Sequence, residues 1–226
     1  MKENYVISKY IDNPLLIGGK KFDLRLYVLV TNYRPLKIWM YSQGFGRFCN
    51  ETYTTDVAEM ENMFVHLTNV AIQKFSDKYS DKHGGKWGLK SLRFYIESVF
   101  GKDVMMKCFE GINTIIIQSI KSVQSVIIND KHCFEMYGYD VLLDSNCKPW
   151  LVEINASPSL TTTNEADKML KKQLIDDVFK IVTPNQGETG ENDNDNNNFY
   201  VLYDESVEFT SKKINRKSSG SYKIWK

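Results

Sequence analysis

The chain has 226 residues, of which 42% are hydrophobic, 13% aromatic and 25% charged, and this composition excludes wholesale disorder. Its 29 basic and 28 acidic residues leave a net charge of +1, which excludes a protein that binds polyanions through bulk charge alone. The four cysteines (Cys49, Cys108, Cys133 and Cys147) form no CxxC pair, so we interpret them as reduced thiols rather than as a disulfide framework or zinc site.

Targeting signals and membrane segments are not evident in the sequence. The first residues lack the apolar segment of a secretion signal. The most apolar long stretch, residues 104–128, is interrupted by Lys107, Glu110 and Lys121. We therefore expect an intracellular protein that has neither a membrane nor a nucleic acid as its partner.

Hydrophobic patterning predicts strands first and then a mixture of helices and strands. Residues 5–11 and 22–31 are rich in β-formers, and residues 36–41 are expected to return as a strand after a turn at 32–35. The next predicted elements are a helix that stops at Gly101 and a longer helix with Asp103 as its N-cap. These two helices are predicted at residues 89–100 and 103–128. Two strands follow at 134–143 and 149–155, and a last helix at 167–181. This order predicts an α+β fold.

The charges at the end of the chain are unevenly distributed. Residues 185–198 contain four acids and no base, and we interpret them as a disordered linker. Residues 211–226 contain six bases and no acid, while residues 199–203 are expected to pair with the folded body as a strand. We therefore predict a folded domain at 1–184, followed by a largely disordered acidic linker and basic tail at 185–226.

Two acids and an amide gather on the predicted hairpin of residues 134–155. With Ser145–Lys148 as a four-residue loop, Asp144 faces Pro149 and Asp140 lies opposite Glu153, on the face that also carries Asn155. Carboxylates on a half-buried face need a cation or a proton, and hard oxygen ligands suit Mg²⁺. An exposed hairpin whose polar face meets water is an equally good interpretation of this pattern.

Lys21, Asp23 and Arg25 alternate along a predicted strand, so their side chains share one face. Such a row suits the neutralisation of phosphate, although a solvated outer face is the commoner explanation of the row by itself. Residues 43–48 contain two glycines without the GxGxxG spacing or a following helix, which excludes a Rossmann site. We expect His66 to be packed or hydrogen-bonded and assign it no catalytic role.

Five blocks of sequence resemble, in the same order, the tubulin–tyrosine-ligase-like family of ATP-grasp ligases. The clearest are Gly138–Asp140 with Trp150–Pro158, which resemble the metal-binding hairpin of the family, and Lys21–Arg25 with His66–Lys74. The resemblance covers nearly all of residues 5–184. It implies an ATP-grasp-like fold with central and C-terminal lobes, and we expect the N-terminal lobe to be absent, with this chain as the C-terminal portion of a longer ligase.

The resemblance also implies the site residues. Lys21 and Arg25 are implied as catalytic residues, Arg47 and Lys86 as contacts of the incoming glutamate, and Asp140, Glu153 and Asn155 as ligands of Mg²⁺. Without the family, Arg47 and Lys86 are more simply explained as surface residues of glycine-containing turns. The implied contacts of ATP are Ser8, Lys9, Tyr10, Ile11, Lys21, Asp23, Thr68 and Asn69, those of residues 8–11 through a hinge strand.

Within the family, blocks at residues 18–19, 83–87, 129–135 and 225–226 most resemble the catalytic subunit of the tubulin polyglutamylase complex. This implies a ligase that uses ATP and Mg²⁺ to add free L-glutamate to glutamate side chains of the tubulin C-terminal tail through an acyl phosphate. The implied partners are tubulin, microtubules and the subunits of a polyglutamylase complex. The implied location is the cytoplasm and cytoskeleton, including the axoneme or basal body of a ciliated or flagellated organism.

Two alternatives to this function remain open. The polypeptide could be an inactive tubulin-binding or complex-assembly fragment whose basic tail attracts the acidic tails of tubulin. It could also be a ligase that uses glycine or an acceptor other than tubulin.

Overall fold

The computed structural model describes residues 4–5, 7–79, 85–128, 130, 132–183 and 197–207. The elements in chain order are β1 (Leu16–Ile17), β2 (Lys20–Tyr33), β3 (Leu36–Phe48), η1 (Val57–Glu59), α1 (Met63–His66), α2 (Val70–Gln73), β4 (Lys86–Gly88), α3 (Leu89–Phe100), α4 (Lys102–Val123), β5 (Glu135–Leu143), β6 (Pro149–Asn155), α5 (Glu165–Val182) and β7 (Phe199–Asp204). In the described part of the chain, the strands are ordered β4-β3-β2-β5-β6, with β1 on β2 and β7 on β3. The predicted α+β composition is confirmed.

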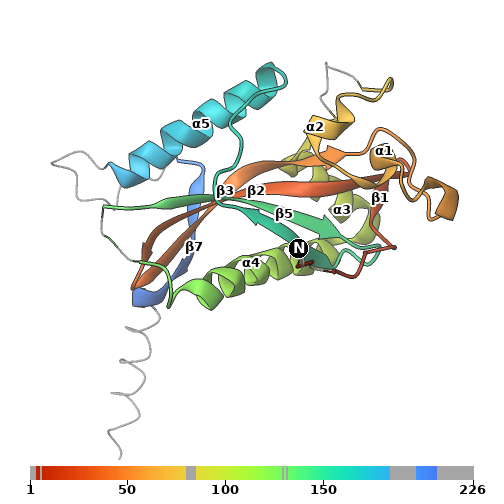
Figure 1. The fold of residues 1–226 in the computed structure, drawn as a ribbon. Coiled ribbons are helices and arrows are strands. Elements are labelled where there is room, and N and C mark those ends of the chain that lie inside the picture. Colours follow the sequence, from red (N-terminus) through yellow and green to blue (C-terminus); the bar gives the residue numbers. More distant parts are fainter. Residues whose placement is uncertain are drawn as a thin grey trace, which may run out of the picture. The chain divides into compact units, whose positions relative to one another are not determined.

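β2 is a central strand that lies between β3 and β5 (Figure 1). Both of its alternating faces are buried, because Tyr27, Val28, Leu29 and Val30 have no exposed surface. A strand covered on both faces reads as a continuous apolar run, which explains the composition of this segment. The charged residues at the beginning of the same strand therefore need partners inside the protein.

The chain divides into two compact units. The first comprises Met1–Arg25, Phe45–Ile112 and Asp140–Val152, and the second Leu26–Gly44, Asn113–Tyr139 and Glu153–Lys226. In the first unit α3 packs closely on β3, since a Cβ atom at Gly46 would lie 2.7 Å from a methyl carbon of Leu92. The glycine at this position thus permits the close approach of helix and strand.

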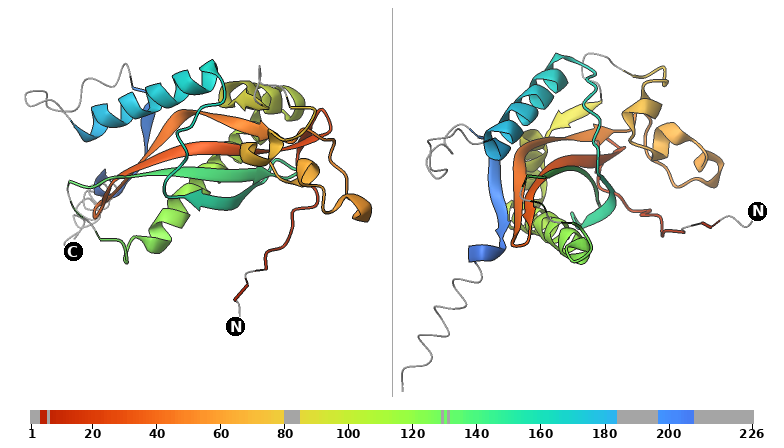
Figure 2. Two further views of the ribbon diagram at one scale, coloured as in Figure 1. Left: turned by 45° about the horizontal axis from the view of Figure 1, so that its top comes forward. Right: turned by 60° about the vertical axis from the view of Figure 1, so that its left-hand side comes forward.

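In the second unit the blue strand β7 lies beside β3 (Figure 2). The two strands are antiparallel, with Lys37 opposite Asp204 and Tyr41 opposite Phe199. This confirms the strand predicted at residues 199–203 and shows that the folded chain extends beyond residue 184. Most of the predicted acidic linker and all of the basic tail at 211–226 lie outside the described residues.

Two predicted details of secondary structure are wrong. No strand forms in the described residues of the segment 4–11, where Tyr5 and Ile7 are 77% and 95% exposed and no neighbouring strand pairs with the backbone. α4 begins at Lys102, so Asp103 lies in its first turn rather than at the N-cap, and the helix ends at Val123 instead of residue 128. The strand predicted at 36–41 continues through residues 43–48 as part of β3.

The hairpin between β5 and β6 has a three-residue loop instead of the predicted four. The backbone N–H of Asp144 donates to the carbonyl of Lys148 at 3.0 Å, and that of Cys147 donates to the carbonyl of Asp144 at 2.8 Å. Cys147 has a φ of 60°, as in the bulged type of tight hairpin. Asp144 therefore pairs with Lys148, not Pro149, and counting from the loop no longer places Asp140 directly opposite Glu153.

Among the described residues, no helix is both long and apolar enough to cross a membrane.

Candidate functional site

β2 carries Lys21, Asp23 and Arg25 on one face, as their alternation predicts. Lys21 is 7% exposed and Asp23 is 4% exposed, and the side chain of Arg25 is 12% exposed. The alternative of a solvated outer face is therefore wrong. Charges buried to this degree are tolerated only when they are paired or hydrogen-bonded.

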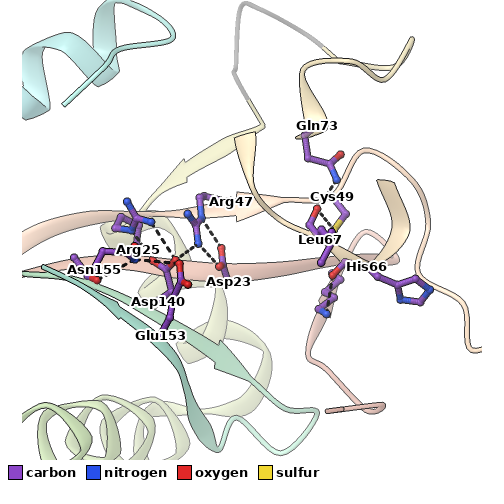
Figure 3. Close-up of polar contacts among 12 residues, drawn as sticks. Asp23, Arg25, Arg47, Cys49, His66, Leu67, Gln73, Asp140, Glu153 and Asn155 are labelled. Atoms are coloured by element: carbon purple, nitrogen blue, oxygen red, sulfur yellow. Dashed lines mark hydrogen bonds and ion pairs between the residues drawn. The ribbon is translucent and has the colours of Figure 1, made fainter. Parts of the chain in front are cut away.

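Two aspartates and two arginines of the first unit form a continuous ion-pair network (Figure 3). Arg47 donates from Nε to Oδ1 of Asp23 at 2.8 Å, and its Nη2 contacts the other oxygen of Asp23. The same Nη2 lies 2.7 Å from Oδ2 of Asp140. Arg25 donates two hydrogen bonds to the carboxylate of Asp140, from Nε at 2.5 Å and from Nη2 at 3.0 Å. We call Asp23, Arg47, Asp140 and Arg25 the arginine–aspartate network.

The arginine–aspartate network is electrically balanced, because each arginine is matched by one aspartate. Burial lowers the pKa of Arg47, but hydrogen bonds and charge interactions with Asp23 and Asp140 more than offset this, and the net effect is a raised pKa. Arg47 thus remains a fixed cation. The planar fork of a guanidinium group matches the geometry of a carboxylate and also that of a phosphate.

Lys21 lies beside this network with neutral oxygen atoms as its hydrogen-bond acceptors. Its Nζ donates to the carbonyl of His66 at 2.9 Å and to the hydroxyl of Tyr10 at 3.2 Å. Burial lowers the pKa of Lys21, while the charges of Cys49 and Asp23 act in the opposite direction. A buried ammonium that is held by neutral groups retains its attraction for an anion, as expected of a phosphate contact.

The two residues expected to contact glutamate are brought together by the sheet. Arg47 on β3 is the register partner of Lys86 on β4. Lys86 Nζ lies 4.6 Å from the centre of the Phe45 ring. Neither residue lies in the turn that the sequence suggested, because both belong to strands.

The expected metal ligands are divided between the two units. Asp140 belongs to the first unit and is bound by Arg25 and Arg47. Glu153 and Asn155 belong to the second, where Nδ2 of Asn155 donates to Glu153 Oε1 at 3.1 Å. Asn155 makes this bond through its amide nitrogen, so its amide oxygen is the atom suited to a cation. The carboxylate and amide oxygens fit Mg²⁺ chemically, and the three-ligand site stays a prediction.

No group of three or more His, Cys, Asp and Glu side chains gathers as a metal site within the described residues. The predicted set contains two acids and one amide, so this finding does not bear on it. All four cysteines are free thiols, and Cys133 is the exposed one.

The remaining expected contacts of ATP occupy two segments of the first unit. Ser8, Lys9 and Tyr10 are exposed in an extended segment, and Ile11 is partly buried. Thr68 is 7% exposed, and Asn69 is the N-cap residue of α2 without a side-chain capping bond. Tyr10 and His66 line a hollow of about 530 Å³ together with Tyr53 and Met60.

Gln73, which no sequence motif singled out, is a buried residue that holds the segment with Thr68 in place. Its Nε2 donates to the carbonyl of Leu67 at 2.5 Å, and its Oε1 accepts from the backbone N–H of Asn50 at 2.8 Å. The side chain of Asn50 returns a bond to the Gln73 carbonyl at 2.7 Å. An amide at the end of a one-turn helix gives no sequence signal of this role, because one of its partners, Asn50, follows the end of a distant strand.

Comparison with known proteins gives a family for this chain. A family model described as "Tubulin-tyrosine ligase family" matches residues 1–191. The chain belongs to the tubulin-tyrosine ligase family. The family resemblance that the sequence blocks indicated is thereby confirmed.

The chain is 62% identical over 240 residues to "Probable alpha-tubulin polyglutamylase Ttll1" of Tetrahymena thermophila, an alignment that covers 100% of this chain and 57% of the relative. It is 52% identical over 180 residues to "Probable tubulin polyglutamylase TTLL9" of Bos taurus, covering 80% of this chain and 39% of the relative. It is 38% identical over 197 residues to "Tubulin polyglutamylase TTLL5" of Homo sapiens, an alignment that covers 80% of this chain and 15% of the relative. The chain thus spans little more than half of the first of these family members and less of the others.

Proposed function

We propose that this chain supplies nucleotide and amino acid contacts of an ATP-dependent ligase that adds glutamate to glutamate side chains in the tubulin C-terminal tail. The observation that carries the proposal is the buried arginine–aspartate network beside Lys21, in a chain of the tubulin-tyrosine ligase family. The names of the similar relatives, which are called tubulin polyglutamylases, support the choice of glutamate and tubulin.

The proposed reaction has two steps. The γ-phosphoryl group of ATP moves to the γ-carboxylate of the acceptor glutamate, which gives an acyl phosphate and ADP. The amino group of free glutamate then attacks the acyl carbon, phosphate leaves, and an isopeptide bond forms. Such a reaction depends on positioning and electrostatic stabilisation rather than on a protein nucleophile.

The cations of the site have separate proposed roles. Tyr10 and His66 take two of the three N–H donors of Lys21, and the third is proposed to bind a phosphate oxygen of ATP. Arg25 stabilises the charge of the phosphate or of the acyl phosphate. Arg47 and Lys86 orient the carboxylates of the incoming glutamate, because their register pairing sets two cations side by side.

Asp140, Glu153 and Asn155 are proposed to hold Mg²⁺, which neutralises the phosphates of the nucleotide when it is bound. The fold is proposed to be ATP-grasp-like, with microtubules and the subunits of a polyglutamylase complex as partners. The proposed place of action is the cytoplasm and cytoskeleton, with axonemes and basal bodies in ciliated or flagellated cells.

The test measures transfer of radiolabelled glutamate to microtubules by the purified full-length protein, with and without ATP. Glu153→Gln removes a proposed ligand charge and is expected to reduce the transfer at least tenfold. Lys78→Ala is the control, because Lys78 is 65% exposed and its ion pair with Glu51 lies at the surface, and this variant is expected to retain the wild-type rate. Undiminished ATP-dependent transfer by Glu153→Gln would refute the metal assignment.

The same assay separates the alternatives. Co-sedimentation with microtubules without transfer by the wild-type protein would favour the binding fragment. Preferential transfer of radiolabelled glycine would replace glutamate as the proposed substrate.

A further inference from the structure

Lys21 is held by two groups that are distant in the sequence and carry no charge. The hydroxyl of Tyr10 accepts a hydrogen bond from Nζ at 3.2 Å, and the Tyr10 ring centre lies 4.7 Å from the same nitrogen. The carbonyl of His66 accepts a second bond at 2.9 Å. All three residues belong to the first unit, and Tyr10 and His66 also line the hollow described above.

The two hydrogen bonds of the His66 ring determine which group donates and which accepts in its contact with Tyr10. Nε2 of His66 lies 3.1 Å from the carbonyl oxygen of Glu59, which has no proton to donate, so Nε2 must be the donor. In the neutral ring Nδ1 is then an acceptor, and it lies 2.8 Å from the hydroxyl of Tyr10. The bond to His66 therefore uses the proton of the Tyr10 hydroxyl, and the oxygen lone pairs of Tyr10 face Lys21. Tyr53 is a further hydrogen-bonding neighbour of this hydroxyl, and its own proton goes to the carbonyl of Asp12 at 2.9 Å.

We propose that His66 is a positioning residue, which fixes the Tyr10 hydroxyl as an acceptor and thereby holds the Lys21 ammonium ready for a phosphate oxygen. The proposal rests on the proposed function for the identity of the phosphate, which is that of ATP. It adds a role for the His66 ring and for the Tyr10 side chain.

Charge explains why neutral partners suit this lysine. The neighbouring carboxylate on the same strand face, Asp23, accepts two contacts from Arg47, so its charge is largely matched by that arginine. A hydroxyl and a carbonyl satisfy N–H donors without neutralising the ammonium, which leaves its charge for an incoming anion. Burial raises the pKa of Tyr10, so the phenol keeps the proton that it donates to His66.

The first test compares two replacements of His66 in the full-length protein. Asn places a polar atom near the position of Nδ1, whereas Gln places one near Nε2, so His66→Asn retains an acceptor for Tyr10 and His66→Gln loses it. Titration with a fluorescent ATP analogue is expected to show affinity within about twofold of wild type for His66→Asn and about tenfold weaker for His66→Gln. Equal affinities of the two variants would overturn the proposal.

The second test does not depend on catalysis. Tyr10→Phe keeps the ring over Lys21 but removes the oxygen that stabilises the ammonium. Lys21 is acetylated with an amine-reactive ester at a series of pH values, and the extent of modification is measured by mass spectrometry. The midpoint of the pH profile in Tyr10→Phe is expected to lie about 0.4 to 1 pH unit below that of the wild type. Tyr95→Phe is the control, because its ring contact with Trp87 survives the change and it lies in α3, away from Lys21.

A Lys21 profile of Tyr10→Phe that superimposes on the wild-type profile would overturn the proposal even if both proteins fold. The outcomes also separate this inference from the proposed function. A wild-type protein that binds no ATP would refute the proposed function, while the acetylation profile would still decide whether Tyr10 and His66 position Lys21.

Discussion

Arg47 and Lys86 lie directly opposite each other on β3 and β4. Opposite residues of an antiparallel pair point to the same face, with Cβ atoms about 4.5 to 5.5 Å apart. Arg47 is 7% exposed and bound to two aspartates, whereas the Lys86 ammonium rests over the ring of Phe45. A fixed cation and an adjustable one therefore share a face, which suits a ligand with two carboxylates.

Replacing Lys86 by Ala is expected to raise the KM for glutamate about tenfold in the full-length protein, with kcat changed little. The physical reason is that the variant loses one charge-assisted bond to a carboxylate while Arg47 keeps its place. Lys90→Ala, on the exposed side of α3, is the matched control. Steady-state kinetics with varied glutamate measures the effect, and an unchanged KM would contradict the assignment of Lys86.

Replacing Asp140 by Asn is expected to lower the free energy of unfolding by about 3 to 5 kcal/mol, because a buried pair that loses one partner leaves uncompensated charge. Arg25 and Arg47 both bind this carboxylate, whose side chain is 2% exposed. Urea unfolding measures the change. Glu51→Gln, which breaks a more exposed pair with Lys78, should cost less than about 1 kcal/mol. Similar losses for both variants would show that the network contributes no special stability.

Asp177 is expected to stabilise the second unit in a pH-dependent manner. This carboxylate of α5 has no exposed surface and accepts bonds from Asn198 at 2.8 Å and from Gln173 at 2.9 Å. Burial raises its pKa, but hydrogen bonds from Asn198, Lys180 and Gln173 outweigh burial, and the net pKa is lowered. A lowered folded pKa gives stability that is present above the ordinary carboxyl pKa of about 3.9 and lost as the pH falls below it.

Urea unfolding of Asp177→Asn should therefore show a deficit against wild type at pH 7 that shrinks below about pH 4. Asp176→Asn changes the exposed neighbouring carboxylate and serves as the control. A deficit that stays constant from pH 7 to pH 3 would show that the charge of Asp177 is not responsible.

The cysteines are expected to differ in their rate of alkylation. Burial raises the pKa of Cys49 and of Cys108 to about 12, so little thiolate forms at pH 8. Cys133 is exposed. Mass spectrometry after treatment with iodoacetamide should find Cys133 modified first, and all four cysteines modified in denaturant. Native Cys49 reacting as fast as Cys133 would contradict the buried position of Cys49.

Several parts of the fold and site follow from local sequence. The strand of Pro149–Asn155 and the helix of Leu89–Phe100 have the predicted bounds. The common face of Lys21, Asp23 and Arg25 also follows from the two-residue period of a strand. These features depend on neighbours along the chain, whose spacing and propensities are visible in the sequence.

Long-range pairing was decided by the tertiary structure. Nothing near Arg47 in sequence predicts that it lies in a strand and binds Asp23 and Asp140, because these partners come from β2 and β5. The left-handed conformation of Cys147 gives a hairpin loop that is one residue shorter than predicted. The register of Asp140 therefore differs from the predicted one.

The sequence by itself determined the family, the α+β order and the residue types of the site. Only the tertiary structure decided that the charged row of β2 is buried and that Lys21 rests on Tyr10 and His66. The physical reason is that burial depends on which distant segments cover a strand. A row of alternating charges has the same pattern on an outer face and in a core, and only its partners distinguish the two.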